Sequence, residues 1–143
     1  MPDEPVVRAA QEADADSVFD LARRFATSLV PRPAEFHRHY RALIADPGAC
    51  VLVVEQHGSV QGYLLGFEHL TFFANGTVAW VEEIMVRQGQ RQAGLGRMLM
   101  EEFERRAADR GSKLVALATR RAAGFYTGLG YEPSATYFRR VLG

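Results

Sequence analysis

The sequence feature that most constrains the fold is a run of three strands in the middle of the chain, joined by two turn sequences. Residues 50–73, CVLVVEQHGSVQGYLLGFEHLTFF, contain two β-rich runs separated by His57-Gly58, and residues 78–86 form a third run after Asn75-Gly76. Dipeptides of this kind favour the positive φ angles of tight hairpin turns. We therefore predict three consecutive antiparallel strands at the centre of one sheet.

The segments on either side of this centre alternate between strand and helix patterns. Helices are expected where apolar residues recur every three or four positions, and strands where β-branched or aromatic residues cluster. The expected elements are, in order, a strand, two helices, the three central strands, a helix, a strand, a helix and a closing strand. The elements outside the three central strands are expected, in the same order, over residues 5–10, 12–29, 34–46, 95–111, 113–119, 120–130 and 134–142. A helix between two strands of one sheet makes those strands parallel. The predicted sheet is therefore mixed and mostly antiparallel.

Length and composition indicate one domain, residues 1–143, of an ordinary soluble protein. The 143 residues are 48% hydrophobic and 24% charged, and 17 basic residues balance 17 acidic ones. This balance lacks the positive field that nucleic-acid binders use, and no apolar stretch approaches the roughly 20 residues of a membrane span. We expect a cytoplasmic protein that binds neither nucleic acid nor membrane.

The cysteine and histidine residues predict neither a disulfide nor a metal site. Cys50 is the only cysteine, so no internal disulfide can form, and it lies in a strand-like run that suits a buried apolar residue. The four histidines show no metal-ligand spacing. We expect no metal.

Two glycines stand directly in front of a predicted helix, in the sequence RQAGLGRMLMEEF of residues 91–103. Gly94 and Gly96 have two interpretations: a plain tight turn, or a backbone cradle in which the unpaired amides of the helix N-terminus bind a phosphate. Arg91 and Arg97 would add positive charge to such a cradle. Neither the Walker loop nor the dinucleotide-binding fingerprint fits these residues. On this stretch alone, both interpretations stay open.

The longer sequence around these glycines resembles motif A of the GCN5-related N-acetyltransferases (GNATs). The resemblance covers residues 81–104, VEEIMVRQGQRQAGLGRMLMEEFE, and its core is Arg91 to Gly96. Residues 114–131, LVALATRRAAGFYTGLGY, are similar to motif B of this family, with Phe125-Tyr126 placed before Leu129-Gly130-Tyr131. The element order also matches over nearly the whole chain. The resemblance implies an α/β fold of the α+β type, with six to seven strands in a mixed sheet and about four helices.

The resemblance further implies that acetyl-CoA is the cosubstrate. Its pyrophosphate would lie on backbone amides at the head of the helix, and its pantetheine arm would pair with the preceding strand as an added strand does. An amide N–H near Met85 would polarise the thioester carbonyl. By resemblance, the cofactor-binding residues are Ile84, Met85, Val86, Arg91, Gln92, Ala93, Gly94, Leu95, Gly96 and Arg97.

Direct transfer of an acetyl group to an amine requires a base for the amine proton and an acid for the leaving thiolate. The match to motif B implies that Tyr126 is the acid, and core packing is the alternative role for this residue. The stretch VEEIMV resembles the acidic pair of spermidine/spermine acetyltransferases. That likeness implies Glu82 as the base and Glu83 as the group that holds a cationic substrate. Strand alternation would send these two side chains to opposite faces, and the alternative is one exposed glutamate and one at a strand edge.

The expected function is transfer of the acetyl group of acetyl-CoA to a primary amine of a small molecule, such as a polyamine-like or amino-acid amine. Two other functions stay open. One is acetylation of a peptide N-terminus or of lysine side chains in a protein, and the other is a non-catalytic acyl-CoA-binding sensor module. Family members often dimerise, so the resemblance also implies a homodimer without indicating its interface.

Overall fold

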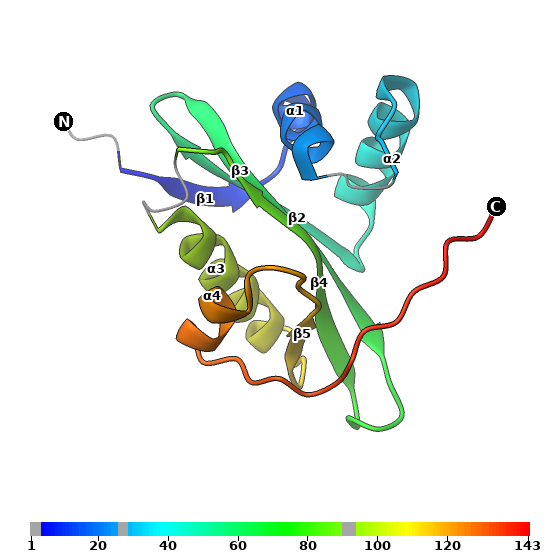
Figure 1. Ribbon diagram of the computed structural model, residues 1–143. Coiled ribbons are helices and arrows are strands. Elements are labelled where there is room, and N and C mark those ends of the chain that lie inside the picture. Colours follow the sequence, from blue (N-terminus) through cyan, green and yellow to red (C-terminus); the bar gives the residue numbers. More distant parts are fainter. Residues whose placement is uncertain (1–3, 26–28, 90–93) are drawn as a thin grey trace.

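The computed structural model of the chain is a single five-stranded sheet with helices on both faces (Figure 1). The structure describes residues 4–25, 29–89 and 94–143. The strands are β1 (Val6–Ala9), β2 (Ala49–Gln56), β3 (Ser59–Leu70), β4 (Thr77–Val86) and β5 (Val115–Leu117). The helices are α1 (Ala15–Phe25), α2 (Pro33–Ala45), α3 (Leu95–Asp109) and α4 (Ala123–Gly128), with a 3-10 turn η1 (Glu12–Asp14) before α1.

The sheet is mixed, as the sequence predicts, and its strands follow the order β1-β2-β3-β4-β5. The first four strands pair antiparallel with their neighbours, and β5 pairs parallel with β4 after the α3 crossover. The expected count of six to seven strands is wrong, because the described residues form five. Residues 134–142, the expected closing strand, have no regular secondary structure. Their side chains suit a strand, but a strand forms only where a partner supplies the other half of the hydrogen-bond ladder.

The two turns between the central strands differ from each other. His57 and Gly58 both have positive φ, 56° and 74°, and form the expected two-residue turn between β2 and β3. The tight turn expected at Asn75-Gly76 is wrong, because residues 71–76 form a wider loop there. The backbone N–H and the hydroxyl of Thr71 both donate to the carbonyl of Gly76, at 3.0 and 2.8 Å, and these bonds close the loop.

The helices cover the two faces of the sheet as two layers (Figure 1). On one face α1 and α2 pack through residues such as Val18 and Leu21. On the other, the predicted apolar stripe of α3 is buried against β2 and β3, and it consists of Leu95, Leu99, Phe103 and Ala107. Each large side chain buried in this way stabilises the fold by about 1.5–3 kcal/mol. The two layers hold β4, between them, in a fixed position.

Candidate active site

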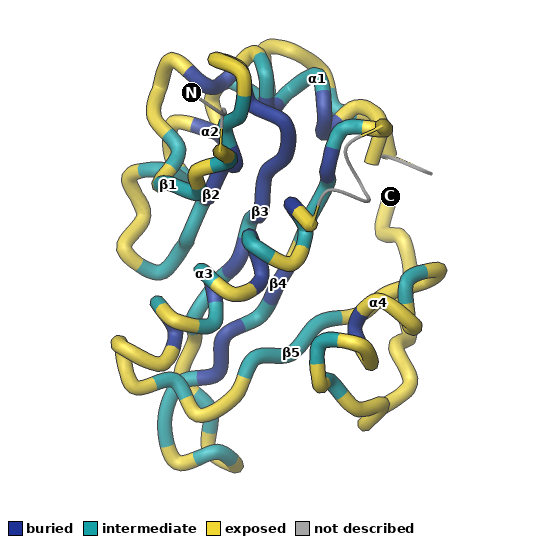
Figure 2. The backbone as a smooth tube through the Cα atoms, turned by 90° about the vertical axis from the view of Figure 1, so that its left-hand side faces the viewer, coloured by how far each residue is buried: buried dark blue, intermediate teal, exposed yellow. Residues whose placement is uncertain are grey.

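The sheet opens between β4 and β5. Parallel pairing joins Ala79–Val81 to Val115–Leu117 and stops there, while β4 continues along β3 as far as Val86. Figure 2 shows the two strands separating beyond this point. Within the described part of the chain, residues 82–86 therefore have one edge without a partner strand. An open edge of this kind can bond an extended, amide-bearing chain.

The backbone groups that face this opening follow from the β3–β4 ladder. The N–H of Arg87 donates to the carbonyl of Gln61 at 2.7 Å, and the register is regular from residue 83 onward. Alternation along an antiparallel ladder then turns the N–H and C=O groups of Met85 toward β3 as well. The amides that face the open edge are those of Ile84 and Val86, one on each side of Met85.

A β-bulge interrupts β4 at the acidic pair. Leu65 pairs with Glu83, whereas the next residue of β3, Gly66, pairs with Val81, so Glu82 is an extra residue on β4. Val81 and Ile84 are three positions apart, yet both pack into the cluster under α3. The regular alternation of side chains is therefore interrupted between Val81 and Ile84. Bulges redirect side chains in this way and are frequent beside active sites.

The two acidic side chains have different surroundings. Glu82 is exposed, whereas Glu83 is half-buried. The hydroxyl of Tyr63, a residue of β3, donates to Oε1 of Glu83 at 2.7 Å. Burial raises the pKa of Glu83, and the charge of Glu82 raises it further, while the hydrogen bond from Tyr63 lowers it. Glu83 is thus a carboxyl group whose pKa lies closer to neutrality than that of an ordinary glutamate.

Tyr63 is the residue of this site that the sequence analysis missed. Its side chain is 2% exposed and belongs to the cluster under α1 and α2. The available signal was a tyrosine within the apolar run of the second central strand. Its partner is 20 positions away, and the bulge that brings the two together is not visible in the sequence.

The N-terminus of α3 has the properties of an anion site. Gly94 is the N-cap, with φ 80° and ψ 12°, a left-handed conformation that favours glycine. The first intrahelical bond runs from the N–H of Met98 to the carbonyl of Gly94, at 3.1 Å. The N–H groups of the three residues between them therefore lack an intrahelical acceptor. The first turn contains no acidic residue, and Arg97 is exposed there.

These features fit a bound phosphate group. A Cβ added to Gly94 would meet no atom within 4 Å, so the backbone is accessible at that point. The dipole of a long helix adds partial positive charge at the same end. Three of the predicted cradle residues, Arg91, Gln92 and Ala93, lie outside the described residues.

Helix α4 carries Tyr126, the predicted general acid, and lies next to the N-terminus of α3. A Cβ on Gly96 would lie 3.2 Å from the Phe125 ring and 3.9 Å from Val86, so the start of α3 lies against both α4 and the end of β4. Tyr126 is 8% exposed and belongs to the same cluster as Val86 and Leu95. Burial raises the pKa of its phenol. The structure thus gathers Ile84, Val86, Leu95, Gly96 and Tyr126 on the α3 side of the opening.

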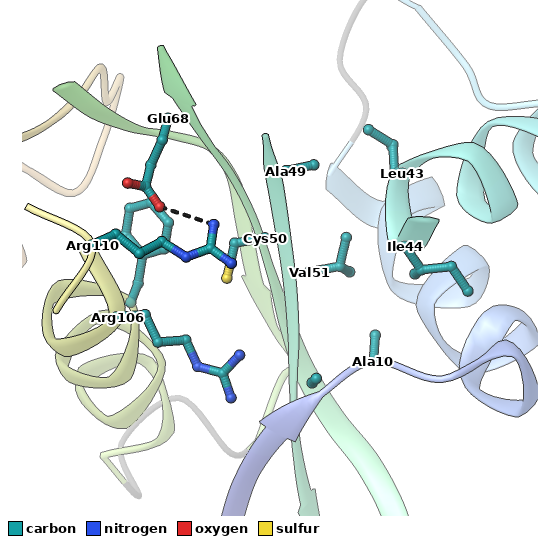
Figure 3. Close-up of a pocket in the computed structure, with 11 residues that line it drawn as sticks. Ala10, Leu43, Ile44, Ala49, Cys50, Val51, Glu68, Arg106 and Arg110 are labelled. Carbon is teal, nitrogen blue, oxygen red and sulfur yellow. Dashed lines mark hydrogen bonds and ion pairs between the residues drawn. The ribbon is translucent and has the colours of Figure 1, made fainter. Parts of the chain in front are cut away.

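A separate cavity of about 110 Å³ lies toward the opposite edge of the sheet, between β2, α2 and α3 (Figure 3). Its charged wall is already paired, because Arg110 and the hydroxyl of Ser112 both bind Glu68, at 3.3 and 2.6 Å. Burial raises the pKa of the Cys50 thiol in this cavity, which disfavours thiolate chemistry. None of the predicted site residues that the structure describes lines the cavity, so it is distinct from the β4–β5 opening.

Among the residues that the structure describes, no group of three or more His, Cys, Asp or Glu side chains is arranged to hold a metal ion. None of the described helices has the length and apolar character needed to cross a membrane.

A family-model match assigns this mixed sheet, which opens beside a bulged strand and a glycine-capped helix, to the acetyltransferase class. The model of the acetyltransferase (GNAT) family matches residues 15–131. The chain therefore belongs to the GNAT acetyltransferase family, as its two motifs predict. No curated protein matches it in a sequence comparison.

Solved structures confirm the fold. An acetyltransferase from Trypanosoma brucei superposes with a TM-score of 0.84 at 22% identity, covering 97% of this chain and 100% of that one. Glucosamine-6-phosphate N-acetyltransferase from Arabidopsis thaliana gives 0.87 at 16% identity, covering 98% and 99%. An aminoglycoside acetyltransferase from an uncultured soil metagenomic sample gives 0.77 at 14% identity, covering 97% of each chain. At these identities the likeness shows the shared fold.

Proposed function

We propose that this protein transfers the acetyl group of acetyl-CoA to a primary amine of a small molecule. The observation that carries the proposal is the opening between β4 and β5, with a carboxyl group on one face of the sheet and a phenol on the other. Glu83 bonds to Tyr63 in the cluster under α1 and α2, whereas Tyr126 lies in the cluster under α3. An extended molecule on the open edge of β4 would lie between these two groups.

Acetyl-CoA supplies the reactive acetyl thioester. The amides of Leu95, Gly96 and Arg97 would hold its pyrophosphate, together with Gly94 and, by sequence, residues 91–93. The open-edge amides of Ile84 and Val86, flanking Met85, would hold the amide groups of the pantetheine arm. One of these two N–H groups would also polarise the thioester carbonyl, as the sequence predicts for an amide near Met85.

The surroundings of the acidic pair favour Glu83 as the base, in place of Glu82. A base works best when its pKa lies near the working pH, and burial moves the pKa of Glu83 in that direction. Glu83 accepts a proton from the amine as the nitrogen bonds to the acetyl carbon. The carbon–sulfur bond breaks, and the hydroxyl of Tyr126 gives its proton to the departing sulfur. Exposed Glu82 is suited to hold a cationic substrate.

Two of the structural neighbours support the proposal that the acceptor is a small-molecule amine. Their names describe acetyltransferases for glucosamine 6-phosphate and for aminoglycosides, and both kinds of compound are amino sugars. The balanced charge of this chain, 17 basic and 17 acidic residues, gives no broad surface field for a strongly charged macromolecule.

Mass spectrometry of acetylation reactions tests this function against its alternatives. The purified protein is incubated with acetyl-CoA and either a panel of polyamines, amino acids and amino sugars or a panel of peptides. We expect acetylated products in the first panel. Products confined to the peptide panel would support N-terminal or lysine acetylation instead. Acetyl-CoA binding without any product would support the sensor module.

We also propose that the protein is cytoplasmic, because acetyl-CoA is a metabolite of the cell interior. We further propose that it forms a homodimer, because the segment after α4 suits self-association. Residues 132–143, near the C-terminus, are exposed (Figure 2). Their large apolar side chains are 54–87% exposed, and they are Tyr137, Phe138, Val141 and Leu142. Among the described residues β5 is the last strand of the sheet, so its outer edge would be open to a strand from a second copy.

A further inference from the structure

Tyr63 is almost fully buried, although its hydroxyl group is polar and would ordinarily favour contact with water. Its ring packs in the cluster formed by α1, α2 and the sheet, with Val18, Leu21 and Val53. A phenylalanine ring would fill the same space. A buried phenol needs a hydrogen-bond partner, and the partner here is Glu83, at 2.7 Å.

The contact between Tyr63 and Glu83 is diagonal across the part of the ladder that follows the β-bulge. Tyr63 pairs directly with Met85, so it reaches Glu83 two positions further along β4. Diagonal neighbours on one face of a sheet lie within reach of long side chains. The contact engages Oε1 of Glu83, whereas Oε2 accepts no hydrogen bond from the described residues.

We propose, on the basis of the proposed function, that Tyr63 is a positioning residue for the base: its hydroxyl fixes the Glu83 carboxylate so that Oε2 takes the amine proton. The hydrogen bond removes rotational freedom from a side chain that must meet the substrate in one orientation. It also stabilises the ionised form of a carboxyl group whose pKa burial raises.

Few other charged groups act on Glu83. Glu82 of the same strand raises its pKa, and Tyr63 is the partner from β3. From α1, which packs on this face, Asp20 reaches the end of β4 and pairs there with Arg87 at 3.7 Å. Of the described groups that act on Glu83, the Tyr63 hydroxyl is the one that lowers its pKa.

The test is the pH profile of kcat/KM for Tyr63→Phe. Because the variant loses the bond that lowers the Glu83 pKa, the acidic limb of the profile should move to higher pH. At the low pH values of that limb, kcat/KM of the variant should be about fivefold below that of the parent protein, the effect of losing one hydrogen bond. At high pH the two values of kcat/KM should be equal. The Kd for acetyl-CoA should not change. A profile identical to that of the parent protein would overturn the proposal.

Tyr40→Phe is the matched control. Tyr40 is 4% exposed in the same cluster, and its hydroxyl donates to the carbonyl of Gln11 at 2.7 Å. This variant loses an equivalent buried bond, so it reports any general effect on packing. Its pH profile should match that of the parent protein, and an equal shift in both variants would show that the Tyr63 effect is structural.

Two more measurements test the role of Tyr63 even if Tyr63→Phe folds poorly or shows no turnover. Replacement of Tyr63 by 3-fluorotyrosine keeps the ring and strengthens the phenol as a donor, so it should move the acidic limb to lower pH. A carbon-13 NMR titration of the Glu83 carboxyl in Tyr63→Phe needs no substrate. An unchanged titration would contradict the role of Tyr63, whereas a shifted titration without turnover would contradict only the proposed function.

Discussion

One extra residue in β4 determines which member of the acidic pair can serve as a base. The sequence identifies Glu82 and Glu83 as unusual within an apolar strand, but strand periodicity cannot tell which of them is sheltered. That distinction depends on the bulge, which is a property of the β3–β4 register. The glycine at the N-cap of α3 was easier to predict, because a left-handed N-cap is a local requirement that Gly94 meets by itself.

Glu83→Gln should lower kcat at neutral pH by about 10²–10⁴-fold, the usual contribution of a general base. In the parent protein, activity should be lost as the pH falls through the raised pKa of Glu83, because the protonated carboxyl cannot accept a proton. Steady-state kinetics across pH measure both effects. Glu82→Gln is the matched control, and a greater loss in that variant would restore Glu82 as the base.

Tyr126→Phe should lower kcat while leaving the Kd for acetyl-CoA nearly unchanged. The ring is buried among Val86, Leu95 and its neighbours, and phenylalanine preserves that packing. Only the proton donor is removed. Isothermal titration calorimetry gives the Kd and the acetylation assay gives kcat. A proportional loss of binding would instead make Tyr126 a packing residue.

At the level of elements, the amphipathic pattern of α3 was predictable and the end of the chain was not. The stripe from Leu95 to Ala107 is set by helical spacing, and it is buried as expected. Residues 134–142 have the composition of a strand, but a strand also requires a partner, which composition does not report. The opening beside β4 was likewise visible only through the family resemblance, since it depends on where β5 stops.

Gly66 should be required for α3 to pack on the sheet. A Cβ at this position would lie 2.5 Å from the Phe103 ring. Gly66→Ala should therefore lower the free energy of unfolding by about 1–3 kcal/mol, as overpacking does, measured by urea denaturation. Gly124→Ala is the control, because a Cβ there meets nothing within 4 Å. Equal stability of the two variants would contradict this account of the packing.

At the level of the whole molecule, the exposed C-terminal segment predicts self-association. Sedimentation should show a dimer, and Phe138→Ser should shift it toward the monomer, because this 87% exposed ring would lose its apolar contact with the second copy. Phe72→Ser is the control, since Phe72 is fully exposed in the loop between β3 and β4. A parent protein that is monomeric at all concentrations would rule out this dimer.

The central claim is that the β4–β5 opening is the acetyl-CoA site, and an NMR titration with acetyl-CoA tests it most directly. In the backbone amide spectrum, the largest shifts should fall on Ile84, Val86, Leu95 and Gly96. Amides around the cavity of Cys50 and Arg110 should change little. Shifts concentrated at that cavity, with the opening unaffected, would contradict the account.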